Sequence, residues 1–367
     1  MNGMLSSRWF RIYIVPGAVC QSVMVGGGYG TGREIVEYFT SYGFLGGTLG
    51  FGVAFLLMGL IISLTFEFSR LNRAYDYRNF FKLLLGRGWV AYEVLIILMF
   101  LLVLAVLASA AGNILRDNFQ IPYGYGLVVM LVFIGILTFY GRELIAKVLT
   151  FWSLFLYVVF VAYLIIVFSR SGGEILQLVG DREIVAGWAT SGFKYGSYNI
   201  SAVPLLLYVA RGFESRREAL LSGVVAAFIG LFPGLIFHFA FQAYYPDILL
   251  EAIPVYWTMV QLGTGVLLIV YSVMLFGTFI ETGAGMLQGI NDRLDSYLTE
   301  VRGTGFSRTM HATIAVSAVI VSALLSSIGI TALIADGYGT MAWAFFAIYV
   351  IPIVFIGLPK ILKNDDS

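Results

Sequence analysis

The chain has 367 residues, of which 59% are hydrophobic and 12% are charged, and its mean hydropathy is +0.90. Soluble domains carry about 25% charged residues, so the composition excludes a soluble domain and predicts an all-α membrane protein. A single signal peptide cannot account for apolar runs that repeat along the full length. The formal net charge of +1 says nothing about partners, and one cysteine, Cys20, excludes an internal disulfide.

Ten apolar segments approach the length of about 20 residues that a membrane span requires. We number them as spans one to ten; they cover residues 11–40, 45–69, 89–113, 123–140, 144–169, 185–210, 217–243, 261–290, 309–329 and 337–358. In this arrangement 17 lysines and arginines fall on one side of the membrane and 3 on the other. The positive-inside rule then places both termini in the cytoplasm. We expect a single transmembrane domain over residues 1–367, multi-pass in the cytoplasmic (inner) membrane.

Span one is interrupted by glycine. Residues 25–34 read Val-Gly-Gly-Gly-Tyr-Gly-Thr-Gly-Arg-Glu, with five glycines within seven residues. Each glycine weakens a helix relative to alanine, so we expect the backbone to unwind around Gly26, Gly27 and Gly28. Unwound backbone at membrane depth survives only where it is buried in protein or lines a cavity. The segment therefore predicts an internal binding site.

Span six carries a second interruption, at residues 195–204. Pro204 removes a backbone donor, and the side chains of Asn199 and Ser201 can bond to freed peptide groups, so a break is expected near Asn199. Paired interrupted helices in corresponding positions of two halves indicate the substrate site of a transporter. Small residues also line helix–helix contacts. Packing remains the alternative for both breaks, and it is the favoured interpretation for glycines of span two such as Gly50 and Gly52.

These motifs resemble the amino acid–polyamine–organocation (APC) superfamily, whose members share a LeuT-type 5+5 inverted repeat. The glycine-rich segment 25–30 is similar to the broken first helix of that family, and Leu221-Ser222-Gly223 is similar to the start of its seventh span. More narrowly, the chain resembles the YkvI-type membrane proteins, in which a Gly-Gln-Glu-like triplet follows the first span, here Gly32-Arg33-Glu34. The resemblance implies ten transmembrane helices with helices 1 and 6 broken. The two repeats would cover about 9–170 and 185–358, with a central pocket between spans one, three, six and eight.

The two breaks suggest what the pocket could hold. The outer half of span one would begin with unpaired N–H groups and a positive dipole end, which suit a carboxylate. Carbonyls and polar side chains at the span-six break suit an ammonium group, so a zwitterion such as an amino acid would fit both. The substrate-binding candidates are Gly26, Gly27, Gly28, Tyr29, Tyr198, Asn199, Ile200 and Ser201.

Aromatic residues near the breaks allow a second reading of the pocket. Tyr29, Phe193, Tyr195 and Tyr198 could form a wall that suits a quaternary ammonium group through cation–π contact. Plain core packing is the alternative for each of them.

An outer gate is implied by two charged residues. In LeuT-type proteins an arginine and an aspartate close the outer vestibule, and Arg33 and Asp336 stand at the matching places here. A charge near the membrane interior is costly and usually paired. The alternative is a local pair between Arg33 and Glu37 at i+4. Glu34 could face the pocket, carry a proton or meet only vestibule water.

The coupling ion is left open between Na⁺ and H⁺, and no other cofactor is expected. In sodium-coupled relatives, hydroxyls of span eight join carbonyls of the first helix around the ion. The resemblance implies Thr278 and Thr282 for the hydroxyls and the carbonyls of Cys20 and Val23. The adjacent hydroxyl pair of many relatives is missing, because Phe279 follows Thr278.

Two other side chains could carry a proton instead. Glu281 in span eight is costly to bury ionised, so it is a proton-coupling candidate, with a structural hydrogen bond as the alternative. His238 in span seven could titrate near neutral pH, although a lone intramembrane histidine is more often a satisfied core residue.

The sequence can be compared with three classes of membrane protein. The first is a secondary active transporter that moves an amino acid or a similar small zwitterionic or cationic solute by alternating access. The second is a ligand-sensing subunit of the same fold, like the germinant-receptor subunits, which binds without pumping. A membrane enzyme has no support, because neither a P-loop nor an HExxH motif occurs. The expected partners are a small-molecule substrate and membrane lipid, with no nucleic acid and no obligate protein partner.

Overall fold

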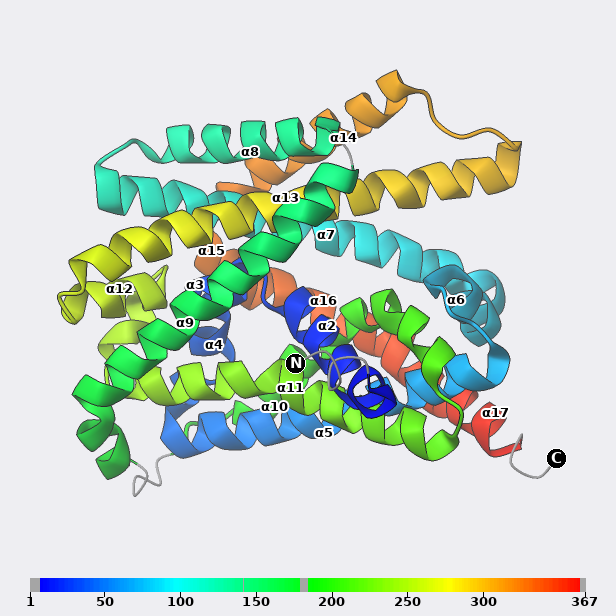
Figure 1. Cartoon of the computed structure of the whole chain (residues 1–367), viewed down its shortest axis with the longest axis horizontal. Coiled ribbons are helices and arrows are strands. Elements are labelled where there is room, and N and C mark those ends of the chain that lie inside the picture. Colours follow the sequence, from blue (N-terminus) through cyan, green and yellow to red (C-terminus); the bar gives the residue numbers. More distant parts are fainter. Residues whose placement is uncertain (1–6, 141, 179–183, 364–367) are drawn as a thin grey trace.

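The computed structural model describes residues 7–140, 142–178 and 184–363, and every regular element among them is a helix (Figure 1). Short 3₁₀ or π segments are labelled η. The elements up to residue 178 are η1 Phe10–Ile14, α2 Val15–Met24, α3 Gly27–Thr31, α4 Arg33–Tyr38, η2 Thr40–Tyr42, α5 Gly43–Asn72, α6 Tyr77–Leu85, η3 Gly86–Gly88, α7 Trp89–Phe119, α8 Tyr123–Tyr140 and α9 Arg142–Leu178.

The second half of the chain is built in the same way. Its elements are α10 Trp188–Asn199, η4 Ile200–Gly212, α11 Arg216–Gln242, η5 Asp247–Leu250, α12 Pro254–Gln261, α13 Gly265–Arg302, α14 Arg308–Ser326, α15 Ile330–Ala332, η6 Leu333–Tyr338, α16 Gly339–Phe345, η7 Phe346–Val350, η8 Ile353–Gly357 and α17 Leu358–Lys363.

Among the described residues, seven helical stretches are long and apolar enough to cross a membrane, and Phe10–Met24 and Tyr123–Ile136 are shorter apolar helices. The chain is therefore a multi-pass helical membrane protein. The expected count of ten spans is not confirmed. The first expected span is divided into short helices and the sixth changes helix type, so neither forms one long apolar helix.

The helices form two groups with the broken first span between them. On one side α10 and α11 pack against α5, and on the other α13 and α14 pack against α7 and α8 (Figure 1). Helix α9 crosses diagonally in this view and contacts both α11 and α13. Helix α2 packs on α11, whereas α3 contacts α7 and α13. The interruption of span one thus lies where the two groups meet.

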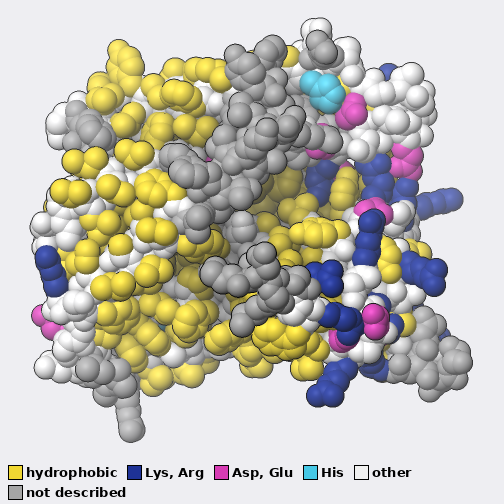
Figure 2. Space-filling model, viewed as in Figure 1, with side chains coloured by type: hydrophobic (Ala, Val, Ile, Leu, Met, Phe, Trp, Pro, Cys, Tyr) yellow, Lys and Arg dark blue, Asp and Glu magenta, His cyan; other side chains and the backbone are white. Residues whose placement is uncertain are grey.

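Charged side chains are not spread evenly over the surface. Figure 2 shows lysine and arginine side chains gathered at one end of the visible face, the end where α6 and α17 lie in Figure 1. Hydrophobic side chains cover much of the remaining face. This asymmetry agrees with the one-sided charge count of the sequence and with a membrane-embedded body.

Glycines allow α5 and α10 to approach closely. A Cβ atom at Gly192 of α10 would lie 2.2 Å from the carbonyl oxygen of Gly50 on α5, a distance that no real contact allows. The backbone of α5 cannot yield as a flexible side chain would. Gly52, by contrast, has no atom within 4 Å of its would-be Cβ. A Cβ at Gly50 itself would lie 3.3 Å from the Trp188 carbonyl oxygen and from the Phe39 ring. Packing therefore accounts for Gly50, as the sequence favoured, but not for Gly52.

We predict that Gly192→Ala destabilises the protein by about 1–3 kcal/mol, because the added methyl group forces α10 away from α5. The matched variant Gly52→Ala should be neutral or more stable, since alanine is the better helix former. Thermal unfolding in detergent measures both. Equal unfolding temperatures for Gly192→Ala and the unmodified chain would contradict the close crossing.

Candidate functional site

Span one breaks where the sequence predicted, and it breaks a second time. Helix α2 ends at Met24, Val25 has ψ +68°, and Gly26 is extended with φ −95° and ψ −162°. Helix α3 lasts only five residues before Gly32, whose φ is +82°. A side chain is excluded at Gly32 on two grounds. The positive φ disfavours any residue other than glycine, and a Cβ there would lie 2.5 Å from the Phe241 ring. The chain then turns into α4.

Span six does not break open as expected but changes helix type. Helix α10 passes at Ile200 into the 13-residue 3₁₀ segment η4, although such segments rarely exceed 3–4 residues. Pro204 lacks the N–H that would bond to the carbonyl of Ser201 in a 3₁₀ helix. The hydroxyl of Tyr92 on α7 donates to this carbonyl instead, at 2.9 Å. The freed carbonyl is thus satisfied by a neighbouring helix, so no unwinding is needed.

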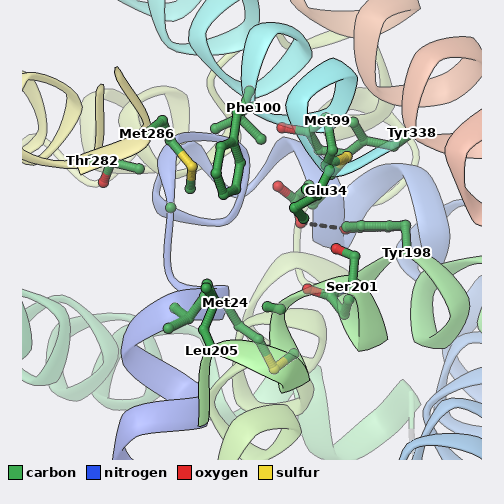
Figure 3. Close-up of a pocket in the computed structure, with 16 residues that line it drawn as sticks. Met24, Glu34, Met99, Phe100, Tyr198, Ser201, Leu205, Thr282, Met286 and Tyr338 are labelled. Atoms are coloured by element: carbon green, nitrogen blue, oxygen red, sulfur yellow. Dashed lines mark hydrogen bonds between the residues drawn. The ribbon is translucent and has the colours of Figure 1, made fainter. Parts of the chain in front are cut away.

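A cavity of about 60 Å³ lies at the first break (Figure 3). This volume has room for about four to six water molecules at roughly 10–15 Å³ each. Its lining residues come from both interrupted spans, α7, α13 and η6: Val23, Met24, Gly26, Glu34, Ile96, Met99, Phe100, Val103, Tyr198, Asn199, Ser201, Ala202, Leu205, Thr282, Met286 and Tyr338.

The carboxylate of Glu34 is the charged group of this cavity. Its side chain is 5% exposed, and the hydroxyl of Tyr198 donates to Oε2 (Figure 3). The backbone N–H of Tyr29 also donates to the carboxylate. A Cβ at Gly28 would lie 2.1 Å from Oε1, so glycine is what lets the carboxylate reach the α3 backbone. The turn at Gly32 brings Glu34 back over the break.

One donor of the expected anion site is already used by the chain itself. The sequence assigned the free N–H groups of the outer half of span one to a substrate carboxylate. That half begins with the five-residue α3, and the N–H of Tyr29 is already bonded to a carboxylate of the chain itself. A substrate carboxylate would have to displace Glu34 from this donor.

The sequence-based candidates divide into two groups. Those that line the cavity are Gly26, Tyr198, Asn199 and Ser201 for the substrate, with Val23 and Thr282 for the ion. Those outside its lining are Gly28, Tyr29, Ile200, Cys20, Thr278, Glu281, Arg33 and Asp336, and the surroundings of Gly27 lie outside what the structure describes. Among the second group, Gly28 still contacts the site through Glu34, and the ring of Tyr29 packs edge-on against Phe237. Phe193, proposed for an aromatic wall, packs on Trp343 and Phe346 instead.

Several lining residues were not expected. The sequence leaves the role of Glu34 open, although a carboxylate inside a span is itself a functional signal. Phe100, Tyr338 and the methionines of the lining have no signal that separates them from ordinary core residues.

The two outer-gate candidates are not paired with each other here. The Arg33 guanidinium bonds to Glu37 at 2.6 Å and to the carbonyl oxygens of Leu249 and Glu251 at 2.7 and 3.1 Å. The local i,i+4 pair is therefore the one present in this conformation. Asp336 is exposed, on an element that touches α4 through the bond from the Tyr38 hydroxyl to the Ile334 carbonyl at 2.9 Å.

The ion-coupling candidates lie on α2 and α13, and one of the two hydroxyls is engaged within its own helix. The hydroxyl of Thr278 donates to the carbonyl of Met274 at 2.9 Å, within its own helix. Thr282 faces the break, with its methyl group 3.7 Å from a would-be Cβ at Gly26. Glu281 is buried and engaged with neighbours. No cluster of three or more His, Cys, Asp or Glu side chains suited to a metal occurs among the described residues.

Both ring nitrogens of His238 have hydrogen-bond partners, which favours a structural role over proton transfer. Its Nδ1 lies 3.2 Å from the Thr40 hydroxyl and its Nε2 lies 3.1 Å from the Phe44 carbonyl. A neutral ring that accepts at Nδ1 and donates at Nε2 satisfies both contacts. The ring therefore ties α11 to the start of α5, as expected for a core histidine.

The chain is similar to one curated relative over most of its length. It is 26% identical over 355 residues to YkvI of Bacillus subtilis (strain 168), described as an uncharacterized membrane protein, and the match covers 91% of each chain. No family model matches the chain.

Two solved transporters share the fold. A Na⁺-coupled sialic acid symporter in a substrate-bound outward-open state aligns with a TM-score of 0.63 at 14% identity, covering 93% of this chain and 78% of the symporter. The manganese transporter of Eremococcus coleocola, in complex with an aromatic bis-isothiourea substituted compound, aligns with a TM-score of 0.55 at 12% identity, covering 97% of each chain. At these identities the likeness establishes the fold. Both neighbours are transporters, in agreement with the expectation that the chain is not an enzyme.

The hydrogen bond from the N–H of Tyr29 to Glu34 gives a prediction that can be tested without a ligand. In Gly28→Ala the new methyl group displaces the carboxylate, which is the movable partner, and the N–H of Tyr29 loses a charge-assisted bond of about 1.5–3 kcal/mol. Amide exchange in the peptide over residues 25–34 should then accelerate about tenfold or more. Gly285→Ala on α13, where the would-be Cβ meets no atom within 4 Å, should leave it unchanged. Unaltered protection in Gly28→Ala would show that Glu34 does not cover the break.

Proposed function

We propose that the chain is a secondary active transporter that moves a small solute by alternating access. The observation that carries the proposal is the cavity at the broken first span, buried between two helix groups and lined by both interrupted helices. Unwound backbone at membrane depth is tolerated where it lines a cavity, and a carboxylate at that depth indicates a functional site. The shared fold with a sialic acid symporter and a manganese transporter supports the same class. The solute is an amino acid or a similar small zwitterionic or cationic molecule.

The proposal includes a ten-span 5+5 inverted repeat. Its first half runs through η1–α4, α5, α7, α8 and α9, and its second through α10–η4, α11, α13, α14 and α15–α17. The first member of each half is the interrupted one, which supports the pairing. Both termini lie in the cytoplasm and the chain sits in the inner membrane, a proposal that rests on the one-sided distribution of lysine and arginine.

Uptake by purified protein in proteoliposomes tests this function. We expect accumulation of a small amine or amino acid when a Na⁺ or proton gradient is imposed, and loss of accumulation when that gradient is collapsed. Sodium dependence that disappears in Thr278→Ala would assign the coupling to Na⁺. Sensitivity to a protonophore that disappears in Glu281→Gln would assign it to H⁺. Tight binding without flux under either gradient would contradict transport and favour the ligand-sensing alternative.

The outer gate gives a separate prediction. We propose that Arg33 exchanges Glu37 for Asp336 when the outer vestibule closes, which is supported by the contact between α4 and η6. Arg33→Ala and Asp336→Ala should each reduce uptake, and the double variant should cost little more, with a coupling of about 0.5–3 kcal/mol. Losses that add within error would show that the two residues act separately.

A further inference from the structure

The charge balance of the cavity is one-sided. Of the described residues that line it, Glu34 is the only one that carries a charge, because no lysine, arginine or histidine belongs to the lining. The neighbouring Arg33 is committed to Glu37 and to two carbonyl oxygens outside the cavity. A buried carboxylate without a cationic partner is unfavourable. A cationic ligand would supply that partner.

Two of the donors near the break are already in use. The N–H of Tyr29 and the hydroxyl of Tyr198 both donate to the Glu34 carboxylate, so neither is free to bind a ligand carboxylate. The lining therefore offers no positive group to a ligand carboxylate, and Glu34 would repel one at short range. A zwitterion would gain at its ammonium end and lose at its carboxylate end.

The remaining polar groups of the cavity can all accept a hydrogen bond. Asn199 donates its amide Nδ2 to the carbonyl of Tyr195 at 3.0 Å, so its other polar atom, Oδ1, is an acceptor. Ser201 adds a hydroxyl oxygen, and Thr282 lies on the opposite side of the cavity (Figure 3). Carboxylate, amide and hydroxyl oxygens together suit the N–H groups of an ammonium ion.

The apolar walls suit the rest of such an ion. The ring of Phe100 faces the space in front of Glu34 (Figure 3), and the rings of Tyr198 and Tyr338 lie with centroids 4.9 Å apart beside the carboxylate. Aromatic faces attract cations, and methionine sulfur packs softly against alkyl groups. A divalent metal prefers several hard oxygen ligands, whereas this lining holds one carboxylate. The volume of about 60 Å³ limits the ligand to a small molecule.

We propose that the cavity selects a small organic ammonium ion that carries no carboxylate, and that Glu34 is its counter-ion. The proposal rests on the transport function given above and narrows its substrate class. It excludes the ordinary zwitterionic amino acids as preferred substrates. Specificity comes from the chain's own carboxylate, which occupies the place at the break that a substrate carboxylate would otherwise take.

A series of ligands with nearly equal size and different charge tests this proposal. Alaninamide is a cation, alanine a zwitterion, lactate an anion and lactamide neutral, and all four share one skeleton. Tetramethylammonium adds a quaternary cation and Mn²⁺ a metal. Binding to the purified full chain is measured from the ligand-dependent shift in unfolding temperature. We expect alaninamide or tetramethylammonium to bind at least about tenfold more tightly than alanine, and lactate, lactamide and Mn²⁺ to give no shift.

Variants assign the selectivity to one side chain. Glu34→Gln should lower cation affinity at least about tenfold and remove the preference over alanine. Glu34→Asp keeps the charge and should keep the preference with weaker binding. Glu174→Gln, which changes an exposed carboxylate on α9, is the matched control and should bind as the unmodified chain does. The unfolding temperature without ligand shows whether each variant is folded.

The outcomes separate this inference from the proposed function. Alanine bound as tightly as alaninamide, a Mn²⁺ response, unchanged cation binding in Glu34→Gln, or no response to any cation would overturn it. If alanine is accumulated by proteoliposomes in preference to alaninamide, transport stands and the ammonium proposal fails. If the cations bind as expected but are never moved, the ammonium proposal stands and transport fails.

Discussion

The carboxylate of Glu34 over the broken first span is the interaction on which the site depends. A carboxylate at this depth is unfavourable unless donors surround it, and two donors are supplied, the hydroxyl of Tyr198 and the N–H of Tyr29. The first comes from α10 and the second exists only because the helix restarts at Gly27. Gly28 provides the room, since any side chain there would collide with Oε1. The Glu34 carboxylate therefore connects the two interrupted spans, and the cavity lies beside this contact.

The same contact suggests how binding could be linked to movement. Span one is divided into short helices at 25–26 and Gly32, so α2 and α4 are connected through few backbone hydrogen bonds. Helix α2 packs on α11 in one helix group, while α3 contacts α7 and α13 in the other. A ligand that pairs with Glu34 would change the balance of bonds between these groups. Such a differential contact is what a ligand needs to shift a conformational equilibrium.

Part of this site could be read from the sequence, and the reasons for the rest are physical. Glycine clustering predicted the break at Gly26, because backbone propensity is a local property. Pro204 marked span six correctly, but the outcome depended on Tyr92, more than 100 residues away, which satisfies the carbonyl that proline leaves free. At Gly32 the Phe241 ring leaves no room for a side chain. The turn there decides that Glu34 faces the cavity while Arg33 bonds to carbonyl oxygens in η5 and just after it. The direction in which these two side chains point is set by tertiary contacts. Composition alone predicts a helical membrane protein. It does not settle the number of spans, because an interrupted span consists of short helices and is not one long apolar helix.

The most direct measurement of the central claim compares how fast two small reagents of opposite charge reach the cavity. A Ser201→Cys thiol in a Cys20→Ser background is treated with an aminoethyl and a sulfonatoethyl methanethiosulfonate, and each rate is divided by the rate with a free thiol in solution. If Glu34 is an anion at the break, the cationic reagent reacts at least about tenfold faster, and Glu34→Gln removes the difference. Equal normalised rates in the unmodified carboxylate background would contradict the account.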